Sequence, residues 1–375
     1  MHIDRIDLIT IRMPLSAPFT TSFSTQTERC PLLVRAVASE SGETVVGWGE
    51  CVALAEPYYS PEYLEGARDV LQRFLIPALF EWQTSGRPVT AQTVSAAVAH
   101  VVGHRMAKAG LELAMLDAQL RLRHTSLAEH LGVTRDSVPA GVSVGIEDSV
   151  SALLDRVGGF IDQGYARIKL KIRPGWDVEP VRAVRERFGD LPLQVDANTA
   201  YRLSDVPTLR NLDPFELLLI EQPLAEDDLR QHAILAQQIS TPVCLDESVI
   251  SAQTAADAIA LGAASVINIK PGRVGGYLEA VRIHDLALAN GVAVWCGGML
   301  ETGIGRAANA ALAGMPGFTL AGDISASDRF YRQDITEPIT MTDGAVAVPR
   351  GPGIGVEPIP DALADSTIHS IELTA

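Results

Sequence analysis

Three acidic residues recur at equal intervals in the second half of the chain. Asp196 lies in VDAN, Glu221 in IEQP and Asp246 in LDES, so 25 residues separate each acid from the next. Carboxylates that converge in a region of low dielectric repel one another, so either some of them are protonated or a divalent cation binds them. An oxygen-only set without His or Cys favours a hard ion, Mg²⁺ or Mn²⁺. The spacing therefore predicts a metal site.

Lysines flank these acids along the chain. The run RIKLKI places Lys169 and Lys171 before Asp196, and Lys270 follows Asp246 in NIKPG. A metal-held carboxylate between two amines is an arrangement that can remove a proton from the neighbouring carbon. The metal stabilises the enediolate, and a lysine whose pKa is lowered by burial and nearby positive charge acts as the base. The alternative is that acids and lysines form ordinary surface ion pairs, and for Lys169 that alternative stays open.

A regular alternation of elements could bring these residues together. Strand-like runs start at 141, 167, 193, 217, 242, 265, 292 and 318, with helical periodicity between them. This alternation is typical of a (β/α)8-type barrel, in which the carboxyl ends of the strands carry the chemistry, and a doubly wound open sheet is the competing topology. A barrel would place Asp196, Glu221 and Asp246 at one height on three neighbouring strands.

Capping residues support the predicted helices of this region. Asp177 is a plausible N-cap with Gly189 just past the end of its helix, and Ser251 opens a helix that closes on Gly262. The sequence predicts the barrel at 126–325.

The flanking segments differ from the barrel repeat. Residues 1–125 show strands near 2–13, 31–39 and 43–49, then a helix with Ser60 as N-cap and Pro61 at its first position, and a helix at 104–122. We expect an α+β domain at 1–125. The tail at 326–375 is predicted to pack back onto that domain.

Composition excludes several classes of partner. The net charge of −16 and the lack of a basic run argue against nucleic acid, and no apolar stretch approaches the length of a membrane span. The four cysteines (Cys30, Cys51, Cys244, Cys296) are far apart, which argues against a disulfide framework or a zinc site. We expect a cytoplasmic protein that acts on a small molecule.

A glycine motif and two acids require separate interpretations. GIGRAA at 303–308 fits a dinucleotide-binding pattern, but MLET separates it from the preceding strand, which disfavours an NAD-dependent oxidoreductase. We expect this helix N-terminus to face an anionic end of the substrate instead. Asp117 is predicted to form a buried ion pair, and the role of Glu247 stays open. A non-catalytic binding protein is disfavoured, because binding alone needs no paired lysines.

The ordered motifs resemble the enolase superfamily: K-x-K in IKLKI, then VDAN, IEQP, LDES and NIKPGRVGG. The resemblance covers nearly the whole chain and implies an α/β fold. A (β/α)7β TIM-like barrel would carry an α+β capping domain formed by the N-terminal segment and the C-terminal tail. It implies Asp196, Glu221 and Asp246 as Mg²⁺ ligands and Lys171 and Lys270 as the acid/base pair. Lys169 would bind or polarise the substrate carboxylate.

Further stretches resemble the o-succinylbenzoate synthase and N-acylamino acid racemase group: APFTTSF, KLKIRPGWDVEPVRAVRERFG, NIKPGRVGGYLEA and WCGGMLETGIGRAAN. This resemblance implies dehydration of 2-succinyl-6-hydroxy-2,4-cyclohexadiene-1-carboxylate in the menaquinone pathway, N-succinylamino acid racemisation, or both. Arg273 matches an arginine typical of members that also racemise. A muconate cycloisomerase or a dipeptide epimerase is an alternative, although Asp323-Ile324-Ser325 breaks the D-x-D pattern of epimerases. A dimer or octamer is expected.

The resemblance also implies two capping loops, 17–30 and 51–60, that close over the barrel. They would offer Phe19, Phe23, Leu54 and Tyr59 to the substrate, while Ser143, Asn198, Gly298 and Leu300 would line the barrel side. Ordinary packing within the capping domain would explain the aromatic residues equally well.

Overall fold

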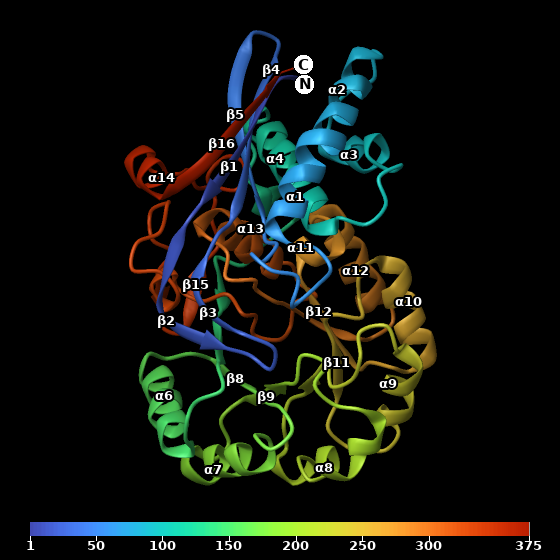
Figure 1. Cartoon of the computed structure of the whole chain (residues 1–375), viewed down its shortest axis with the longest axis vertical. Helices are drawn as coiled ribbons and strands as arrows, with labels where there is room; N and C mark the ends of the chain where they lie inside the picture. The colour runs from blue at the N-terminus through green and yellow to red at the C-terminus, as the bar shows by residue number, and fades with distance from the viewer. Residues whose placement is uncertain (375) are drawn as a thin grey trace.

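A computed structural model of the protein describes residues 1–374. A ring of strands and helices forms the lower part of the molecule in Figure 1, and a second sheet with its own helices lies above it. Across residues 1–374, none of the helices combines the length and the apolar character needed to span a membrane.

Seven parallel strands form the ring, and each is hydrogen-bonded to the next in chain order. They are β7 (Gly141–Val144), β8 (Arg167–Lys171), β9 (Leu193–Asp196), β10 (Ile220–Glu221), β11 (Val243–Leu245), β12 (Val266–Ile269) and β13 (Ala293–Cys296). The helices between and after them are α6 (Val150–Asp162), α7 (Val178–Phe188), α8 (Val206–Arg210), α9 (Leu229–Ala236), α10 (Ala252–Leu261), α11 (Pro271–Val274), α12 (Tyr277–Ala289) and α13 (Gly303–Ala313). Short 3₁₀ turns lie at Leu203–Asp205, Asp213–Phe215 and Ser327–Arg329.

The predicted eighth strand at 318–324 is not a regular strand. Single bridges join Phe318 to Val294 and Gly322 to Ala140, so this segment contacts both edges of the seven-stranded sheet. A Cβ on Gly322 would lie 2.6 Å from the Cys296 carbonyl oxygen, so glycine permits this close passage. The prediction of a strand is wrong, because one bridge on each side makes no continuous ladder, but the segment closes the barrel as expected.

The predicted caps of the barrel helices are confirmed. Asp177 accepts a hydrogen bond from the Val178 amide at the start of α7, and Gly189 follows the end of α7 with a φ of +66°. Ser251 accepts from the Thr254 amide at the start of α10, which ends at Gly262 in the left-handed region. These caps satisfy amides and carbonyls that a helix end leaves without partners.

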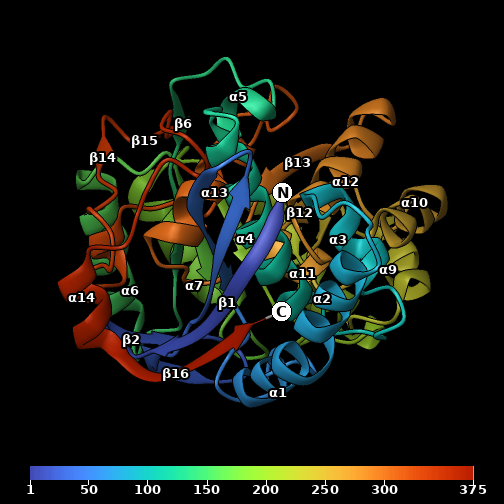
Figure 2. The ribbon, with the colours of Figure 1, turned by 90° about the horizontal axis from the view of Figure 1, so that it is seen from above.

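The second sheet forms the core of a region that we call the cap. Its strand order is β16 (Thr367–Thr374), β1 (His2–Ile11), β4 (Leu32–Glu40) and β5 (Glu43–Cys51). The cap also contains α1 (Leu64–Val70), α2 (Ile76–Thr84), α3 (Ala91–Ala97) and α4 (Arg105–Leu122), and a π-helical turn at Leu71–Leu75 joins α1 to α2. Figure 2 shows α1, α2 and α3 to one side of β1 and β16, and α14 (Pro360–Ser366) to the other.

The helix predicted to start at Ser60 starts later. Tyr63 is the N-cap of α1, and the Ser60 hydroxyl accepts from the Glu62 amide in a separate turn. The Leu64 amide donates to the Leu54 carbonyl at 2.7 Å. This tertiary contact ties the segment to 51–60 and overrides the Ser-Pro start signal.

Two glycines let α4 lie directly on β5. A Cβ on Gly47 would be 2.2 Å from the Ala114 carbonyl oxygen, and one on Gly49 would be 2.0 Å from the Gly110 carbonyl oxygen. Any side chain at these positions would push the helix away from the sheet.

Hairpins and the tail connect the cap to the barrel. Strands β2 (Met13–Thr20) and β3 (Thr25–Arg29) form a hairpin that reaches from the cap towards the barrel in Figure 1. In the tail, β14 (Met341–Thr342) pairs with β15 (Ala345–Ala347), which pairs with β6 (Ser137–Pro139) beside α5 (Leu127–His130). Strand β16 then pairs antiparallel with β1.

Asp117 forms the buried ion pair predicted from the sequence. Arg121 donates to both of its oxygens at 3.0 Å, and the amides of Trp48 and Ile354 donate at 2.8 Å. Burial raises the pKa of Asp117 to about 6, although the Arg121 charge opposes that rise. One carboxylate thus joins β5, α4 and the C-terminal tail.

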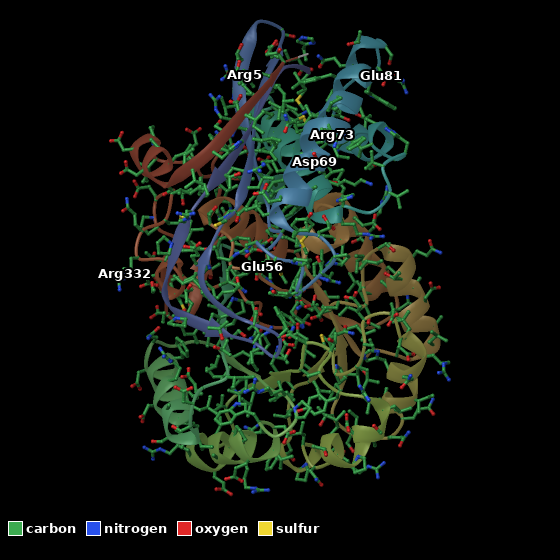
Figure 3. All side chains as sticks on the ribbon, viewed as in Figure 1. Arg5, Glu56, Asp69, Arg73, Glu81 and Arg332 are labelled. Atoms are coloured by element: carbon green, nitrogen blue, oxygen red, sulfur yellow. The ribbon has the colours of Figure 1, made fainter. Side chains whose placement is uncertain are left out.

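We predict that Asp117→Ala lowers the free energy of unfolding by about 3 kcal/mol or more, because the Arg121 Nε–H and the buried amides of Trp48 and Ile354 lose their acceptor. Asp69→Ala is the matched control. Asp69 and Arg73 have the same i,i+4 spacing, but their side chains are 53% and 63% exposed on the outer surface of the cap (Figure 3). That change should cost less than about 0.5 kcal/mol. Urea unfolding followed by circular dichroism measures both, and similar losses would contradict the prediction.

Candidate active site

A cavity of about 720 Å³, counted out to its open mouth, lies between the barrel and the cap. The predicted residues that line it are Phe19, Phe23, Leu54, Tyr59, Ser143, Lys169, Lys171, Asn198, Lys270, Gly298 and Leu300. Asp196, Glu221, Asp246 and Arg273 are buried next to the lysines but do not line the cavity. The structure therefore gathers the predicted residues in one place, with the acids beneath the surface.

Strand register sets the heights of the three acids. Lys171 pairs with Asp196 across β8 and β9, and Asp196 pairs with Glu221 across β9 and β10. Glu221 pairs with Cys244 on β11, so Asp246 lies two residues further along that strand. Strands of such a barrel are tilted and staggered by about one residue per strand, so Asp246, two residues further along and two strands after Asp196, agrees with the expectation that the acids share one height.

Both lysines of RIKLKI are buried, at 2% exposure for Lys169 and 8% for Lys171. The Lys171 amine donates to Asp196 Oδ2 and to Asn198 Oδ1, each at 2.6 Å. The Lys169 amine contacts Asp323 at 2.6 Å, Glu221 at 2.9 Å and Asp196 at 3.3 Å. Neither lysine makes a surface ion pair.

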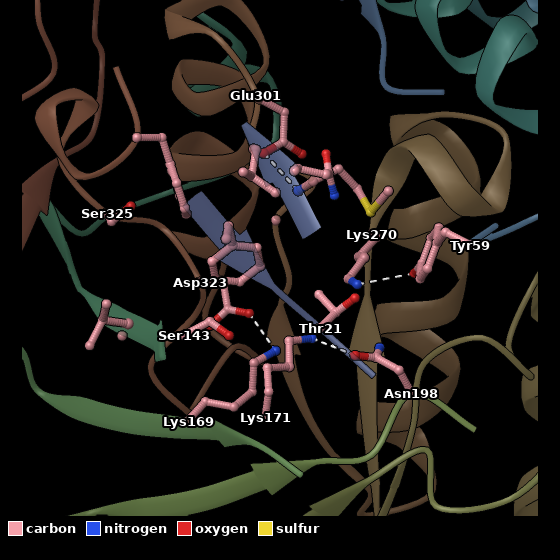
Figure 4. Close-up of a pocket in the computed structure, with 18 of the residues that line it drawn as sticks. Thr21, Tyr59, Ser143, Lys169, Lys171, Asn198, Lys270, Glu301, Asp323 and Ser325 are labelled. Atoms are coloured by element: carbon pink, nitrogen blue, oxygen red, sulfur yellow. Dashed lines mark hydrogen bonds and ion pairs between the residues drawn. The ribbon is translucent and has the colours of Figure 1, made fainter. Parts of the chain in front are cut away.

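Lys270 comes from the other side of the acids. Its amine lies 2.6 Å from Asp246 Oδ2 and donates to the Tyr59 hydroxyl at 3.1 Å, and that hydroxyl donates to the same Asp246 oxygen. In Figure 4 Lys270 and Tyr59 lie across the cavity from Lys169 and Asp323. Lys171 lies on β8, and Lys270 directly follows β12. The three acid-bearing strands, β9, β10 and β11, lie between these two strands.

The ion pairs control the protonation of the buried groups. Burial alone would lower the pKa of Lys270, but Asp246 outweighs it and holds that pKa above its ordinary range. Burial likewise acts to lower the pKa of Lys169. The carboxylates of Asp323, Glu221 and Asp196 outweigh it and hold that pKa above its ordinary range. The lowered pKa expected for a base beside a bound cation stays a prediction for Lys270, because in this arrangement the Asp246 carboxylate contacts its amine.

Asp323 is a site residue that the sequence reasoning missed. It contacts Lys169 and also Arg167 Nη2, the latter at 2.8 Å. Burial would raise the pKa of Asp323, but Lys169 and Arg167 hold it well below its usual range. Its place at the carboxyl end of the closing segment was the available signal, since the other acids were found by that rule.

Amide side chains orient the acids. Asn268 Nδ2 donates to Glu221 Oε1 at 2.6 Å, and Gln222 Oε1 accepts from the Asp246 amide at 3.1 Å. The side chains of Asn268 and Gln222 are both buried.

A hydrogen bond from Asn198 orients the Glu247 carboxylate. Its Oε1 accepts from Asn198 Nδ2 at 2.9 Å, so it holds the amide that also accepts from Lys171. Burial, with Asp246 and Asp196 nearby, raises the pKa of Glu247 to about 7.

Arg273 lies beneath the cavity rather than in it. Its Nε is 3.4 Å from Asp246 Oδ1, and its Nη2 donates to the Asp246 and Glu247 carbonyls. Its guanidinium also lies 5.4 Å from the centre of the Tyr59 ring. Arg273 therefore contacts the residues that hold Lys270, and it does not line the cavity as a substrate contact would.

The acids do not form a ready metal cage as their side chains stand. Among the residues that the structure describes, no three His, Cys, Asp or Glu side chains are grouped to hold an ion. The lysine amines hold the oxygens that a metal would bind.

The donor set nevertheless fits a divalent cation. Asp246 Oδ1 and Glu247 Oε2 are buried without a hydrogen bond from any described residue. Burial, with Asp196 nearby, raises the pKa of Glu221 to about 8, so added positive charge would favour its ionised form. Carboxylate oxygens without His or Cys suit Mg²⁺ or Mn²⁺.

Carboxylates of the protein already bind the N-terminal amides of α13, so these amides are not free to bind a substrate anion. The Glu50 carboxylate accepts from the amides of Thr302 and Gly305, and from the Thr302 hydroxyl at 2.7 Å. The Gly303 amide donates to Asp334. The expectation of an exposed anion site is wrong, because β5 of the cap supplies the anion, and the same contacts leave no room for a dinucleotide phosphate.

Aromatic side chains of the two cap loops meet over the cavity. The Phe23 and Tyr59 rings are 5.9 Å apart, and Phe19 lies edge-on to Phe330 at the same distance. The Ser22 hydroxyl donates to the Asn198 carbonyl at 3.3 Å and ties the hairpin to the barrel.

Comparison with known proteins agrees with this architecture. Residues 152–362 match the family described as enolase C-terminal domain-like, and residues 5–132 match the N-terminal domain of mandelate racemase and muconate lactonizing enzymes. The chain belongs to the enolase superfamily. A solved structure of an enolase superfamily member from Listeria innocua is 38% identical, with a TM-score of 0.94 over 100% of this chain and 99% of that one.

Two relatives narrow the position within the enolase superfamily. An N-succinylamino acid racemase from Amycolatopsis is 61% identical over 372 residues, which cover 99% of each chain. An o-succinylbenzoate synthase from Bacillus subtilis is 45% identical over 359 residues, covering 95% of this chain and 94% of that one. The chain belongs to the group that contains these two activities.

We predict that Gly297→Ala destabilises the protein by about 1–3 kcal/mol, because overpacking a buried site forces its neighbours to move. A Cβ there would lie 2.3 Å from Asn268 Oδ1 and 2.7 Å from Lys270 Cε. Gly159→Ala is the control, since Gly159 is an exposed residue of α6 with nothing within 4 Å of its Cβ position. It should gain about 0.5–1 kcal/mol. Urea unfolding of both variants checks the opposite signs, and a neutral Gly297→Ala would contradict the argument.

Proposed function

We propose that the chain removes and returns the α-proton of a small carboxylate substrate, as an N-succinylamino acid racemase, an o-succinylbenzoate synthase, or both. The observation that carries this proposal is the placement of Lys171 and Lys270. They reach the cavity from strands on either side of the three acid-bearing strands. The names of the two relatives supply the substrate class.

Each lysine has a defined role in racemisation. Lys171, held by Asn198, takes the α-proton from one face of the substrate carbon, and Lys270, held by Tyr59, gives a proton to the other face. For the opposite enantiomer the two amines exchange roles. Dehydration to o-succinylbenzoate needs one of them as base, while the other stays an ammonium that stabilises negative charge on the substrate.

Lys169 remains a cation throughout. Three carboxylates within 3.3 Å hold its proton, so it supplies positive charge and does not act as a base. When bound, a divalent cation held by Asp196, Glu221 and Asp246 would neutralise charge on the substrate carboxylate and compete with Lys270 for Asp246. A lysine with a weaker counter-charge has a lower pKa, and Lys270 could then accept a proton.

The residues argue against two of the alternatives, a dipeptide epimerase and an NAD-dependent oxidoreductase. A dipeptide epimerase must neutralise the α-ammonium of its substrate, but Asp323 is already paired with Lys169 and Arg167, and Ser325 accepts from Arg306. An NAD-dependent enzyme would need a free helix N-terminus after β13, where Glu50 is bound.

We predict that Lys171→Ala and Lys270→Ala each reduce racemisation of an N-succinylamino acid by about 1,000-fold, because each removes the acid/base for one face. Proton NMR in D₂O, with chiral analysis of the product, measures exchange and inversion separately. Lys108→Ala is the control, because Lys108 lies outside this cavity and donates to the Val101 carbonyl. Inversion at the wild-type rate in either active-site variant would exclude the two-base mechanism.

We predict that EDTA abolishes activity and that Mg²⁺ restores it. Calorimetry should show that Glu221→Gln binds Mg²⁺ at least about 10-fold more weakly than wild type, because an anionic ligand is lost. Glu226→Gln changes a neighbouring acid on the β10–α9 loop and should bind as wild type does. Equal weakening in both variants would show a general charge effect instead of a site.

A further inference from the structure

Arg306 differs from the other cations of the cavity. Lys169, Lys171, Lys270 and Arg306 line the same space, and each lysine amine lies 2.6 Å from a carboxylate oxygen. Arg306, in the first turn of α13, is 3% exposed. Throughout residues 1–374 no acid lies near enough to form an ion pair with it. Among these four cavity cations, Arg306 is therefore the one whose positive charge contacts no carboxylate of the described residues.

Neutral groups hold the Arg306 guanidinium in place. Nη1 donates to the Ser325 carbonyl at 2.8 Å and to its hydroxyl at 3.2 Å, and Nη2 donates to the Glu301 carbonyl at 2.7 Å. Nε is buried and has no partner among the described residues. These contacts fix the plane of the group, but they leave its positive charge and two of its five N–H donors, on Nε and Nη2, unmet.

A second guanidinium adds to this charge. Arg329 Nη2 donates to the Ser143 carbonyl at 2.8 Å, and its Nε is also buried without a partner among the described residues. Arg329 and Arg306 lie 4.7 Å and 5.8 Å from the centre of the Phe330 ring. Burial lowers the pKa of Arg329 to about 10. An unpaired cation is costly to bury, and a bound anion would offset that cost.

This charge lies away from the proton-transfer groups. In Figure 4, Ser325, which holds Arg306, lies on the opposite side of the cavity from Lys270 and Tyr59. A substrate whose reacting carboxylate lies at the acids and lysines would therefore direct its other end towards Arg306.

We propose that Arg306 binds a second carboxylate at the far end of the substrate's acyl chain, so that the site selects dianionic substrates. The proposal rests on the proposed function and assigns its substrate selectivity to one residue. Ser325 holds the guanidinium in position, and Arg329 adds positive charge. A succinyl chain ends in the required carboxylate, whereas a simple acyl chain does not.

The test compares an N-succinylamino acid with its N-succinamoyl analogue, in which a neutral carboxamide of the same shape replaces the terminal carboxylate. Wild type should favour the succinyl compound by about 100-fold in kcat/KM, because a buried cation discriminates strongly between charged and neutral partners. Arg306→Met should reduce that ratio to below about 5-fold while changing kcat/KM for the neutral analogue little. Arg306→Lys should keep an intermediate ratio.

Arg135→Met is the matched control. Arg135 also donates to main-chain carbonyls of the closing region, Phe318 and Pro316, but it does not line the cavity. Its ratio should equal that of wild type.

Several outcomes would overturn the proposal. A wild-type preference of less than about 3-fold in kcat/KM for the succinyl compound overturns it, even if Arg306→Met fails to fold. A folded Arg306→Met variant that loses kcat/KM equally for both compounds also overturns it. If wild type turns over neither compound, the proposed function fails, and calorimetry then decides the binding question. If wild type binds the succinyl compound more tightly than its neutral analogue and Arg306→Met loses that difference, the carboxylate site is supported. If wild type binds both compounds equally, the site is overturned.

Discussion

The structure depends on a network of opposite charges buried at the carboxyl ends of the barrel strands. Asp196, Glu221 and Asp323 surround the Lys169 amine, and the side chains of Asp196, Glu221 and Lys169 are at most 2% exposed, while that of Asp323 is 12% exposed. Taking such ions out of water costs several kcal/mol each unless the geometry is good. The strands that carry them must therefore end at fixed relative heights, and this requirement limits how the barrel can close.

The cap completes this end of the barrel. Tyr59 contacts Lys270 and Asp246 from above, and the Ser22 hydroxyl reaches the Asn198 carbonyl. Two further cap carboxylates start barrel helices: Glu50 caps α13, and Glu112 accepts from the Leu278 amide at 3.1 Å in α12. Burial raises the pKa of both acids to about 7. The cap therefore supplies interactions that the barrel would otherwise lack at its helices and its lysines.

The sequence predicted the parts that follow from periodicity. Even spacing located Asp196 and Glu221, and capping residues located the ends of α7 and α10. It did not predict contacts made only by the folded chain. Glu50 reaches Thr302 across 252 positions, so no local pattern announces it. Asp323 was missed as a site residue because the closing segment has bridges instead of a strand ladder, and Ser60 was misassigned because a contact between Leu54 and Leu64 moved the helix start.

The order of the cap strands has a consequence for folding during synthesis. Strand β1 lies between β4, which follows it closely in the chain, and β16, in which Thr374 pairs with Arg5. One edge of β1 therefore stays open on the ribosome until the whole barrel has been made. An unpaired edge is a template for pairing with other chains. Nascent chains that stall before β16 emerges are thus the species most exposed to aggregation and to chaperone capture.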